Sequence, residues 1–369
     1  MISNLSTQHM QAALALGRRG LGRVWPNPAV GCVIADAAGY VAGRGWTQPG
    51  GRPHAEAEAL ARAGNRAKGG TAYVTLEPCS HTGQTPPCAK ALIDAGIARV
   101  VVALQDPDGR VSGRGIAMLE AAGIAVERNV LEAEARFDQA GFLSKVELGR
   151  PLIALKSAAS LDGRIATESG HSQWITGPEA RQRGHMLRAE YDAIIVGIGT
   201  ALADDPSLNC RVAGLSKASP LRIVIDSKLR LDPASDLAKR AADQPTWVFT
   251  TEAAPAEHRA RLEALGVRII AAATDQNGRV DTDSVAHILG DEGITRAIIE
   301  GGGALAAAFL KADLIDRVHS FRAGLIIGGD GRAAIGPLGL DRVDDAPRFM
   351  PHSTRQVGAD SEQLFVRLR

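Results

Sequence analysis

Short apolar runs alternate with segments of helical period along the first part of the chain. Runs rich in Val, Ile and Ala predict strands at Ala29–Asp36, Thr71–Leu76 and Arg99–Leu104. Between these strands, the spacing of apolar positions predicts helices over His54–Ala63 and Cys88–Ala95. This alternation is typical of α/β proteins with largely parallel sheets.

A change of pattern near residue 148 predicts a domain boundary. The helical segment Leu131–Lys145 is followed by the glycine and proline of 148–151, and a new apolar run begins at Leu152–Lys156. A chain of 369 residues is long enough for two domains that each bury a core. We therefore expect domains over residues 1–147 and 148–369.

The second part repeats the alternation of strands and helices. Its predicted strands are Ala193–Val196, Leu221–Ile225, Thr246–Thr250, Val267–Ile270, Arg296–Ile299, Val318–Phe321 and Gln363–Leu368. Its predicted helices are Pro178–Glu190, Pro255–Leu265, Asp281–Leu289 and Ala304–Lys311. Both parts are thus α/β.

Composition narrows the function classes. The 42 Lys and Arg balance the 41 Asp and Glu, so no polyelectrolyte contact with nucleic acid or a membrane surface is indicated. No segment reaches the ~18 apolar residues of a membrane span, and the N-terminus has no uninterrupted apolar core of a signal peptide. With only four cysteines a disulfide framework is not expected, so we predict a soluble cytoplasmic protein. The oligomeric state is left open, a homo-oligomer included.

The strongest chemical signal is His54 and Glu56, followed by Cys79 and Cys88, each cysteine preceded by a proline. One imidazole and two thiolates are three ligands for Zn²⁺, which leaves a fourth tetrahedral position for water, as in catalytic zinc sites. Glu56 is placed to take a proton from such a water and return it to a leaving amine. The alternative is that both cysteines are buried small hydrophobic residues and His54 a surface residue.

The spacing of the two cysteines departs from that of the zinc nucleobase deaminases. Their signature joins H-x-E to P-C-x-x-C, whereas Cys79 and Cys88 enclose the longer insert 80–87. His81 lies in that insert and is a competing candidate ligand.

Several motifs closely resemble those of the bifunctional riboflavin-biosynthesis deaminase/reductases. In the first part these motifs are PNPAVGCVI (26–34), PHAE (53–56), TLEPCSHTGQTPPC (75–88) and QDP (105–107). In the second part they are SLDG (160–163), SQWIT (172–176), DDPSL (204–208) and EGGG (300–303). The resemblance covers essentially the whole chain, and the long cysteine spacing is normal in that family.

The resemblance implies an N-terminal cytidine-deaminase-like zinc domain that acts on a small-molecule pyrimidine ribosyl phosphate. A diaminohydroxyphosphoribosylaminopyrimidine would lose an amino group to zinc-activated water, with His54, Cys79 and Cys88 as ligands and Glu56 carrying the proton. Asn27 would bind the pyrimidine. On the residues alone, Asn27 is explained equally well as a turn residue between two prolines.

The same resemblance implies a C-terminal dihydrofolate-reductase-like domain that reduces the ribosyl group to ribityl with NADPH. It places Ala158, Trp174, Thr200, Asp204, Ser227, Gly302, Gly303 and Ala304 around NADPH. It places Ser172, Arg188, Leu208, Arg211 and Glu300 around the substrate. Glycines that let the backbone approach an anion, and arginines that hold a sugar phosphate, suit these roles.

These residues also have ordinary structural explanations. The glycines of 301–303 form a tight turn in many proteins, Trp174 suits a core or rim position, and Arg188 suits a solvated helix face near Glu190. Asp204, Glu300 and water are all candidate proton donors for the reduction.

The choice between NADPH and NADH is not settled by the residues. Ser227, Lys228 and Arg230 suit a 2′-phosphate, whereas Asp226 beside them suits a free ribose hydroxyl. The segment Val196–Leu202 imitates a dinucleotide fingerprint but ends on Leu, so a Rossmann domain is rejected.

Two other functions remain as hypotheses. A nucleic-acid-editing deaminase would need a basic face and stacking aromatics, which the near-neutral charge and 4% aromatic content oppose. A zinc deaminase fused to a non-catalytic dinucleotide-binding domain would bind NADPH without oxidising it, and sequence cannot separate this from a reductase.

Overall fold

The computed structural model describes residues 4–81, 86–109 and 111–368, which form two compact units, Met1–Gly149 and Arg150–Arg369. Each unit has its own sheet and core, and the two are described separately. Among the described helices, none has the length and apolar character needed to cross a membrane.

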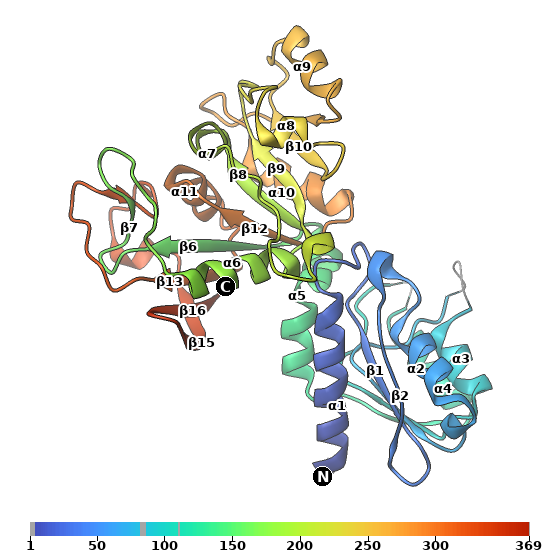
Figure 1. Cartoon of the computed structure of the whole chain (residues 1–369). Helices are drawn as coiled ribbons and strands as arrows, with labels where there is room; N and C mark the ends of the chain where they lie inside the picture. The colour runs from blue at the N-terminus through green and yellow to red at the C-terminus, as the bar shows by residue number, and fades with distance from the viewer. Residues whose placement is uncertain (1–3, 82–85, 110, 369) are drawn as a thin grey trace. The chain divides into compact units, whose positions relative to one another are not determined.

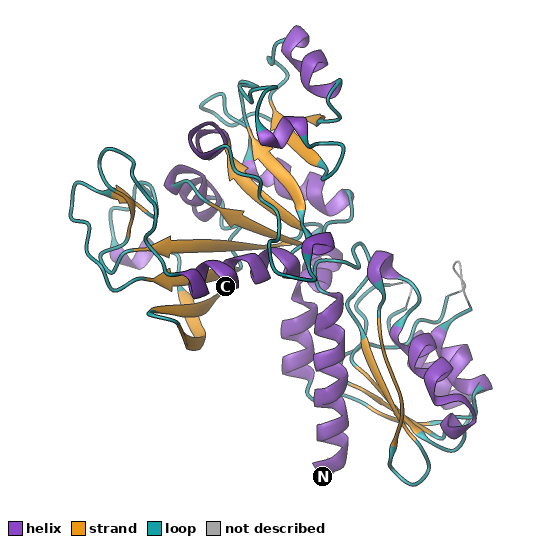
Figure 2. Ribbon diagram, viewed as in Figure 1, coloured by secondary structure: helices purple, strands orange, loops and turns teal. Residues whose placement is uncertain are grey.

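Unit 1 is a layered α/β domain. Its helices are α1 (Asn4–Gly17), α2 (Ala55–Ala63), α3 (Cys88–Asp94), α4 (Arg114–Ala121) and α5 (Glu132–Leu148), and its strands are β1 (Gly31–Ala35), β2 (Val41–Trp46), β3 (Thr71–Val74), β4 (Arg99–Val102) and β5 (Ala125–Glu127). The described strands are ordered β2-β1-β3-β4-β5. Figures 1 and 2 show α1 and α5 on one face of the sheet and α2, α3 and α4 on the other.

The predicted strands and helices of unit 1 are confirmed with shifted ends, but the expectation of a largely parallel sheet holds for only part of it. β3, β4 and β5 are parallel, whereas β1 runs antiparallel to both β2 and β3. The sequence interpretation also missed α1, β2, α4 and β5. β2 was missed because its Gly43 and Gly45 interrupt the apolar alternation.

The two glycines of β2 are there because α2 lies directly on that strand. A Cβ on Gly45 would come within 2.1 Å of the Ala55 carbonyl oxygen and 2.6 Å of the Ala59 amide nitrogen. A Cβ on Gly43 would come within 2.1 Å of the Ala59 carbonyl oxygen. Backbone contact of this kind sets the position of the first turn of α2, which carries Glu56.

We expect Gly45→Ala to destabilise unit 1 by about 1–3 kcal/mol, because the added methyl group pushes α2 off β2. The bound zinc content of the purified chain should fall with it, since His54 directly precedes α2. Thermal unfolding and metal analysis measure the two effects. Gly109→Ala is the matched control, because its Cβ meets nothing within 4 Å; equal behaviour of the two variants would refute the packing argument.

Unit 2 is built on one large sheet. Its strands are β6 (Leu152–Ala159), β7 (Arg164–Ala166), β8 (Ala193–Gly197), β9 (Leu221–Ile225), β10 (Thr246–Thr250), β11 (Arg268–Ala271), β12 (Arg296–Glu300), β13 (Arg317–Arg322), β14 (Arg332–Ala333), β15 (Phe349–Val357) and β16 (Asp360–Arg367). Its helices are α6 (Pro178–Glu190), α7 (Ile198–Asp204), α8 (Asp236–Lys239), α9 (Ala256–Glu263), α10 (Thr282–Asp291) and α11 (Gly303–Lys311). β7 and β14 form a separate small sheet.

The described strands of the large sheet are ordered β11-β10-β9-β8-β12-β6-β13-β16-β15. Pairing is parallel from β11 through to β13 and antiparallel for β13–β16 and β15–β16, so the predicted parallel character is confirmed for most of this sheet. β15 was missed because almost all of its side chains are exposed and its middle part, 352–356, is polar, which removes the alternation that marks a strand.

The parallel strands bring their carboxyl ends to one edge of the sheet, where α/β proteins commonly bind ligands. Helix α7 begins directly after β8, and α11 begins within three residues of the end of β12. Most of the candidate residues of the second domain lie on these strand ends or in the segments that follow them.

Candidate active sites

The first candidate site is a cluster of His54, Cys79 and Cys88 in unit 1. His54 directly precedes α2, Cys79 lies in the loop after β3, and Cys88 is the first residue of α3. His54 Nδ1 is 3.7 Å from Cys79 Sγ and 3.4 Å from Cys88 Sγ, and the Cys88 amide donates a hydrogen bond to Cys79 Sγ at 3.3 Å. The three ligand atoms lie within 4.8 Å of one another.

These distances fit a tetrahedral zinc site. With Zn–S near 2.3 Å and Zn–N near 2.05 Å, a tetrahedral angle separates sulfur from nitrogen by about 3.6 Å. His81 is exposed and is not part of this three-residue group, so it is not supported as a competing ligand. Residues 82–85 of the motif that ends at Cys88 lie outside the described residues.

Glu56 is buried beside this cluster, with 3% of its surface exposed. Its carboxyl group forms a hydrogen bond with the Cys88 side chain. Burial, together with the negative charge of Cys79, raises the pKa of Glu56 to about 7. The first turn of α2 therefore places a carboxyl group next to the candidate ligand atoms.

Asn27 and Glu77 lie close along the chain or in space to the loops that carry the cluster. The side chain of Asn27 lies against Gly51, where a Cβ would approach its amide nitrogen to 2.0 Å. Glu77, which the sequence interpretation quoted without a role, is buried and accepts hydrogen bonds from the amides of Gly113 at 3.0 Å and Gly115 at 2.9 Å. These amides belong to the start of α4, so Glu77 caps that helix. The available signal in the sequence was a carboxylate at the end of an apolar strand.

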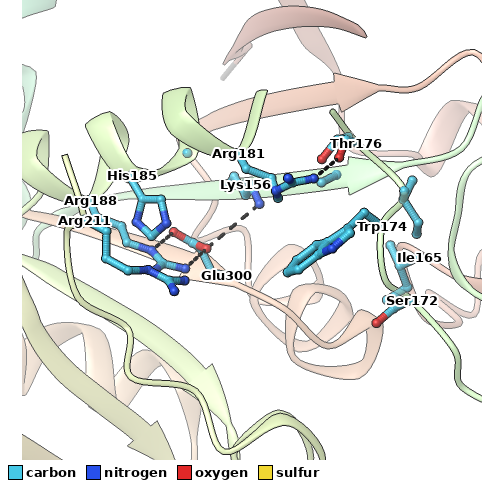
Figure 3. Close-up of a pocket in the computed structure, with 13 residues that line it drawn as sticks. Lys156, Ile165, Ser172, Trp174, Thr176, Arg181, His185, Arg188, Arg211 and Glu300 are labelled. Carbon is cyan, nitrogen blue, oxygen red and sulfur yellow. Dashed lines mark hydrogen bonds and ion pairs between the residues drawn. The ribbon is translucent and has the colours of Figure 1, made fainter. Parts of the chain in front are cut away.

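The second candidate site is a cavity of about 260 Å³ in unit 2. Figure 3 shows its lining, which comes from β6, α6, the end of β12 and the segment 165–176. Six of the predicted residues lie together in it: Ala158, Ser172, Trp174, Arg188, Arg211 and Glu300. An adjoining open pocket of about 570 Å³ shares Trp174, Arg181, His185 and Arg211.

Arg188 and Glu300 form a buried ion pair within the cavity wall. Two parallel hydrogen bonds of 2.9 Å join the guanidinium to the carboxylate, and Lys156 Nζ lies 4.0 Å from the same carboxylate. Burial alone would raise the pKa of Glu300, but the charges of Arg188 and Lys156 outweigh it and lower the pKa to about 2. The interpretation of Arg188 as a solvated surface residue is therefore wrong.

Three ionisable residues of the cavity were missed by the sequence interpretation: Lys156, Arg181 and His185. Arg181, His185 and Arg188 are spaced by four and three positions on α6, which places them on one helix face. That spacing was the signal in the sequence from which Arg181 and His185 could have been predicted. Lys156 gave no signal beyond its place near the end of a strand.

Trp174 lies at the rim of the cavity and is 65% exposed, so a core position is excluded. The Arg181 guanidinium carbon is 4.4 Å from the centre of the Trp174 ring, a cation–π contact. Arg181 also donates a hydrogen bond to the Thr176 carbonyl at 2.8 Å. These contacts hold an exposed aromatic face beside the cavity.

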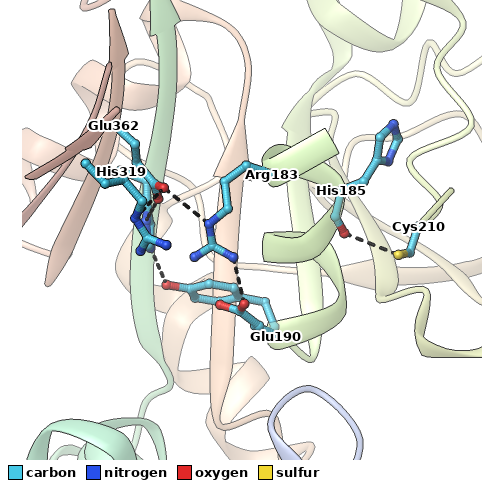
Figure 4. A network of polar contacts seen from close by, with 8 residues as sticks. Arg183, His185, Glu190, Cys210, His319 and Glu362 are labelled. Atoms are coloured by element: carbon cyan, nitrogen blue, oxygen red, sulfur yellow. Dashed lines mark hydrogen bonds and ion pairs between the residues drawn. The ribbon is translucent and has the colours of Figure 1, made fainter. Parts of the chain in front are cut away.

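The opposite face of α6 is anchored by a buried polar network (Figure 4). The Arg183 guanidinium donates hydrogen bonds to the carboxylates of Glu190 at 2.7 Å and Glu362 at 3.2 Å. His319 contacts Glu362 at 3.3 Å and the Tyr191 hydroxyl at 3.0 Å, and burial lowers the pKa of His319. The network ties α6 to β13 and β16 and so fixes the helix face that lines the cavity.

Thr200, Gly302, Gly303 and Ala304 lie together in a second cluster, outside the lining of the cavity. The turn before α11 has φ of +98° at Gly301 and +77° at Gly302, which only glycine adopts readily. A Cβ on Gly301 would lie 3.2 Å from the Thr200 hydroxyl. The turn therefore brings the backbone close to α7.

Asp204, Leu208 and Ser227 are not brought into either group. Asp204 is exposed at the end of α7, and the Ser227 hydroxyl accepts a hydrogen bond from the Val280 amide at 2.9 Å. Leu208 is buried in a left-handed conformation with φ of +52°, directly before Asn209. The Asn209 carbonyl in turn accepts a hydrogen bond from Arg188 at 3.0 Å.

Comparison with known proteins matches both units. A family model described as the RibD C-terminal domain matches residues 151–361, and one described as the cytidine and deoxycytidylate deaminase zinc-binding region matches residues 3–104. The riboflavin biosynthesis protein RibD of Escherichia coli (strain K12) is 41% identical over 95% of this chain and 96% of that protein. The chain belongs to the RibD family.

Other RibD proteins resemble the chain over its whole length. RibD of Aquifex aeolicus is 37% identical, with both chains fully covered. The solved structure of Acinetobacter baumannii RibD matches with a TM-score of 0.88 and 36% identity, covering 99% of each chain. A solved deaminase/reductase from Thermotoga maritima matches with a TM-score of 0.85 and 32% identity, again over 99% of each.

These matches confirm the predicted family and the pair of domain folds, cytidine-deaminase-like and dihydrofolate-reductase-like. The chain is accordingly a bifunctional enzyme of riboflavin biosynthesis, with a zinc-binding deaminase region and a reductase domain. An enzyme of this kind acts on a small molecule, as predicted.

Proposed function

We propose that unit 1 hydrolytically deaminates a diaminohydroxyphosphoribosylaminopyrimidine and that unit 2 reduces the ribosyl group of the product to ribityl with NADPH. The observation that carries the proposal is the His54, Cys79 and Cys88 centre with the buried carboxyl of Glu56 against it. The cationic cavity of unit 2 supports the second step.

In unit 1, His54, Cys79 and Cys88 would hold zinc. A bound zinc ion supplies Lewis acidity that lowers the pKa of a water molecule toward neutrality. Glu56 would accept the proton of that water and deliver it to the leaving amine, a role that suits a buried carboxyl group. Asn27, positioned by the turn at Gly51, would orient the pyrimidine.

In unit 2, the cavity lining supports an anionic substrate. It contains the cations Lys156, Arg181, Arg188 and Arg211 but one carboxylate, Glu300, although the chain as a whole is nearly neutral. Arg188 is already neutralised by Glu300. Arg211 is exposed and has no ion pair among the described residues, so Arg211 with Ser172 is the better-supported pair for the sugar phosphate.

The cofactor would lie against Trp174, Ala158 and the glycine turn before α11, with Thr200 beside that turn. The first amides of α11, at Gly303 and Ala304, suit a phosphate group. Asp204 and Ser227 remain part of the proposed cofactor surface on the resemblance alone, and Leu208 and Glu300 part of the substrate surface.

NADPH is favoured over NADH by the position of Asp226. Its Oδ2 accepts hydrogen bonds from the amides of Arg230 and Leu231, the latter at 2.8 Å, so this side chain is engaged in its own turn. Asp226, the residue that favoured a free ribose hydroxyl, is also fully buried, so its side chain is not accessible to a ligand. Lys228 and Arg230 are exposed beside it and suit a 2′-phosphate.

Of the proton sources considered for the reduction, water is the best supported. Glu300 has a pKa of about 2 and is ionised at neutral pH. Asp204 is exposed and does not line the cavity. Neither carboxylate is therefore suited to give a proton.

The test incubates the zinc-loaded chain with the diaminopyrimidine ribosyl phosphate, with and without NADPH, and follows products by mass spectrometry. We expect the amine to be lost in both tubes and the ribosyl group to be reduced only with NADPH. Deamination without NADPH consumption would show a non-catalytic dinucleotide-binding domain instead. No reaction in either tube would refute the substrate class.

Zinc removal separates the two activities. After chelation of zinc, deamination should fall to background, whereas reduction of previously deaminated substrate should be unchanged, because the metal centre lies entirely within unit 1. Ammonia release and NADPH absorbance measure the two rates. Loss of both activities on chelation would contradict this assignment.

A further inference from the structure

His185 lies among the cations of the unit 2 cavity, yet the proposed reaction gives it no role. It lines both the cavity of about 260 Å³ and the adjoining pocket, on the same face of α6 as Arg181 and Arg188 (Figure 3). Its backbone is held as well, since the Cys210 thiol donates a hydrogen bond to the His185 carbonyl at 3.2 Å (Figure 4).

The hydrogen bonding of the ring assigns its protons. His185 Nδ1 lies 3.1 Å from the Asn209 carbonyl oxygen, and because a carbonyl only accepts, Nδ1 carries a proton. In the described part of the chain Nε2 has no hydrogen-bond partner. A neutral ring therefore offers a lone pair at Nε2, and a protonated ring offers an N–H donor there.

Without a bound anion, the surroundings favour the neutral form of the ring. Burial lowers the pKa of His185, and Arg188 on the same helix and Arg211 on the facing loop lower it further. Arg181 and Lys156 also line this cavity, while Glu300 on β12 and the Asn209 carbonyl favour the charged form. A dianion beside Arg211 would reverse this balance, since it attracts a second positive charge.

We propose that His185, in its imidazolium form, is a ligand of the phosphate group in the unit 2 cavity, where it acts together with Arg211. This rests on the proposed function, which places a phosphate-bearing substrate there. Protonation of the His185 ring is coupled to binding of the phosphate group. The affinity for this group is highest below the pKa of the free ring, and it falls as the pH rises toward the pKa of the ring in the complex.

Sulfate is the appropriate probe, because it stays a dianion across the pH range, whereas the phosphate monoester of the substrate itself titrates near pH 6. For the wild-type chain we expect competitive inhibition by sulfate to weaken by about tenfold between about pH 5.5 and 8.5, equivalent to a pKa rise of about one unit on binding. The KM for NADPH should stay constant.

His185→Asn tests the residue, because the asparagine amide can still donate to the Asn209 carbonyl but cannot titrate. Its sulfate inhibition should be weak and independent of pH, and the KM for substrate should rise with little change in kcat. His287→Asn, on the exposed face of α10, is the matched control and should behave as wild type. An unchanged pH dependence in His185→Asn would overturn the proposal.

A second measurement does not depend on turnover. NMR titration of the nine histidine rings identifies His185 by the signal lost in His185→Asn. Sulfate should raise its pKa relative to chloride at equal ionic strength, and an unmoved pKa would overturn the proposal. Absence of any reduction by the wild-type chain would instead refute the proposed function of unit 2, while this titration would still decide the role of His185.

Discussion

Glu56→Gln is expected to lower the deamination rate by about a hundredfold to ten-thousandfold, the range for loss of a general acid–base group. Glutamine fills the same space in the first turn of α2 but neither accepts the proton of water nor returns it to the amine. The three ligand side chains are untouched, so the zinc content should remain near that of the wild type. Ammonia release measures the deamination rate, and metal analysis measures the zinc content. NADPH oxidation with deaminated substrate measures the reductase activity.

Glu58→Gln is the matched control for this variant. Glu58 lies two positions further along α2 and pairs with Arg62 at 2.7 Å in a partly exposed ion pair. Such pairs contribute little, so this change should leave deamination within about twofold. If Glu56→Gln keeps its zinc and more than a third of the activity, Glu56 is not the proton carrier that we propose.

Glu300→Gln should destabilise unit 2 by about 3 kcal/mol, because it leaves the Arg188 guanidinium buried beside a neutral amide. The magnitude follows from the drop in the pKa of Glu300 from 4.5 to about 2. Reductase activity should fall as well, since the pair forms part of the cavity wall. Chemical unfolding followed by circular dichroism and by residual reductase activity distinguishes unit 2 from unit 1.

The pH dependence provides a second readout for this pair. The pKa of Glu300 is lowered on folding, so its stabilising effect is present above pH 4.5 and is lost as the pH falls toward 2. The stability difference between wild type and Glu300→Gln should shrink over that window.

Glu292→Gln is the control for the buried pair, because Glu292 pairs with Arg268 at the surface and such pairs contribute less than about 1 kcal/mol. Equal losses from the two variants would contradict the importance of burial.

The grouping of His54, Cys79 and Cys88 as a candidate metal site could be predicted from the sequence because local structure positions each side chain. His54 and Cys88 adjoin the starts of two helices, and Cys79 follows a buried strand, so the strand and helix pattern already places all three at one edge of a sheet. Residue types that bind zinc then leave few alternatives. By contrast, the capping role of Glu77 was not predicted, because its partners lie 36 to 39 positions away.

The second candidate site, the cavity of unit 2, was predicted only in part. The residues carried over from the family resemblance identified Arg188, Arg211 and Glu300, but not that two of them neutralise each other. Arg181 and His185 were missed because charged residues on a helix face usually point to solvent. Their face of α6 is turned toward the cavity because Arg183 and Glu190 engage the buried network on the other side.

The sequence by itself determined the α/β character of both parts and the family, and it predicted His54, Cys79 and Cys88 with Glu56 as a candidate zinc site, because these depend on periodicity and on residues close along the chain. Only the tertiary structure decided which charges are free. The partner of Arg188 lies 112 positions away, and Asp226 turns into its own loop. Charge pairing depends on which strands lie side by side, and that order is set by packing of the whole sheet.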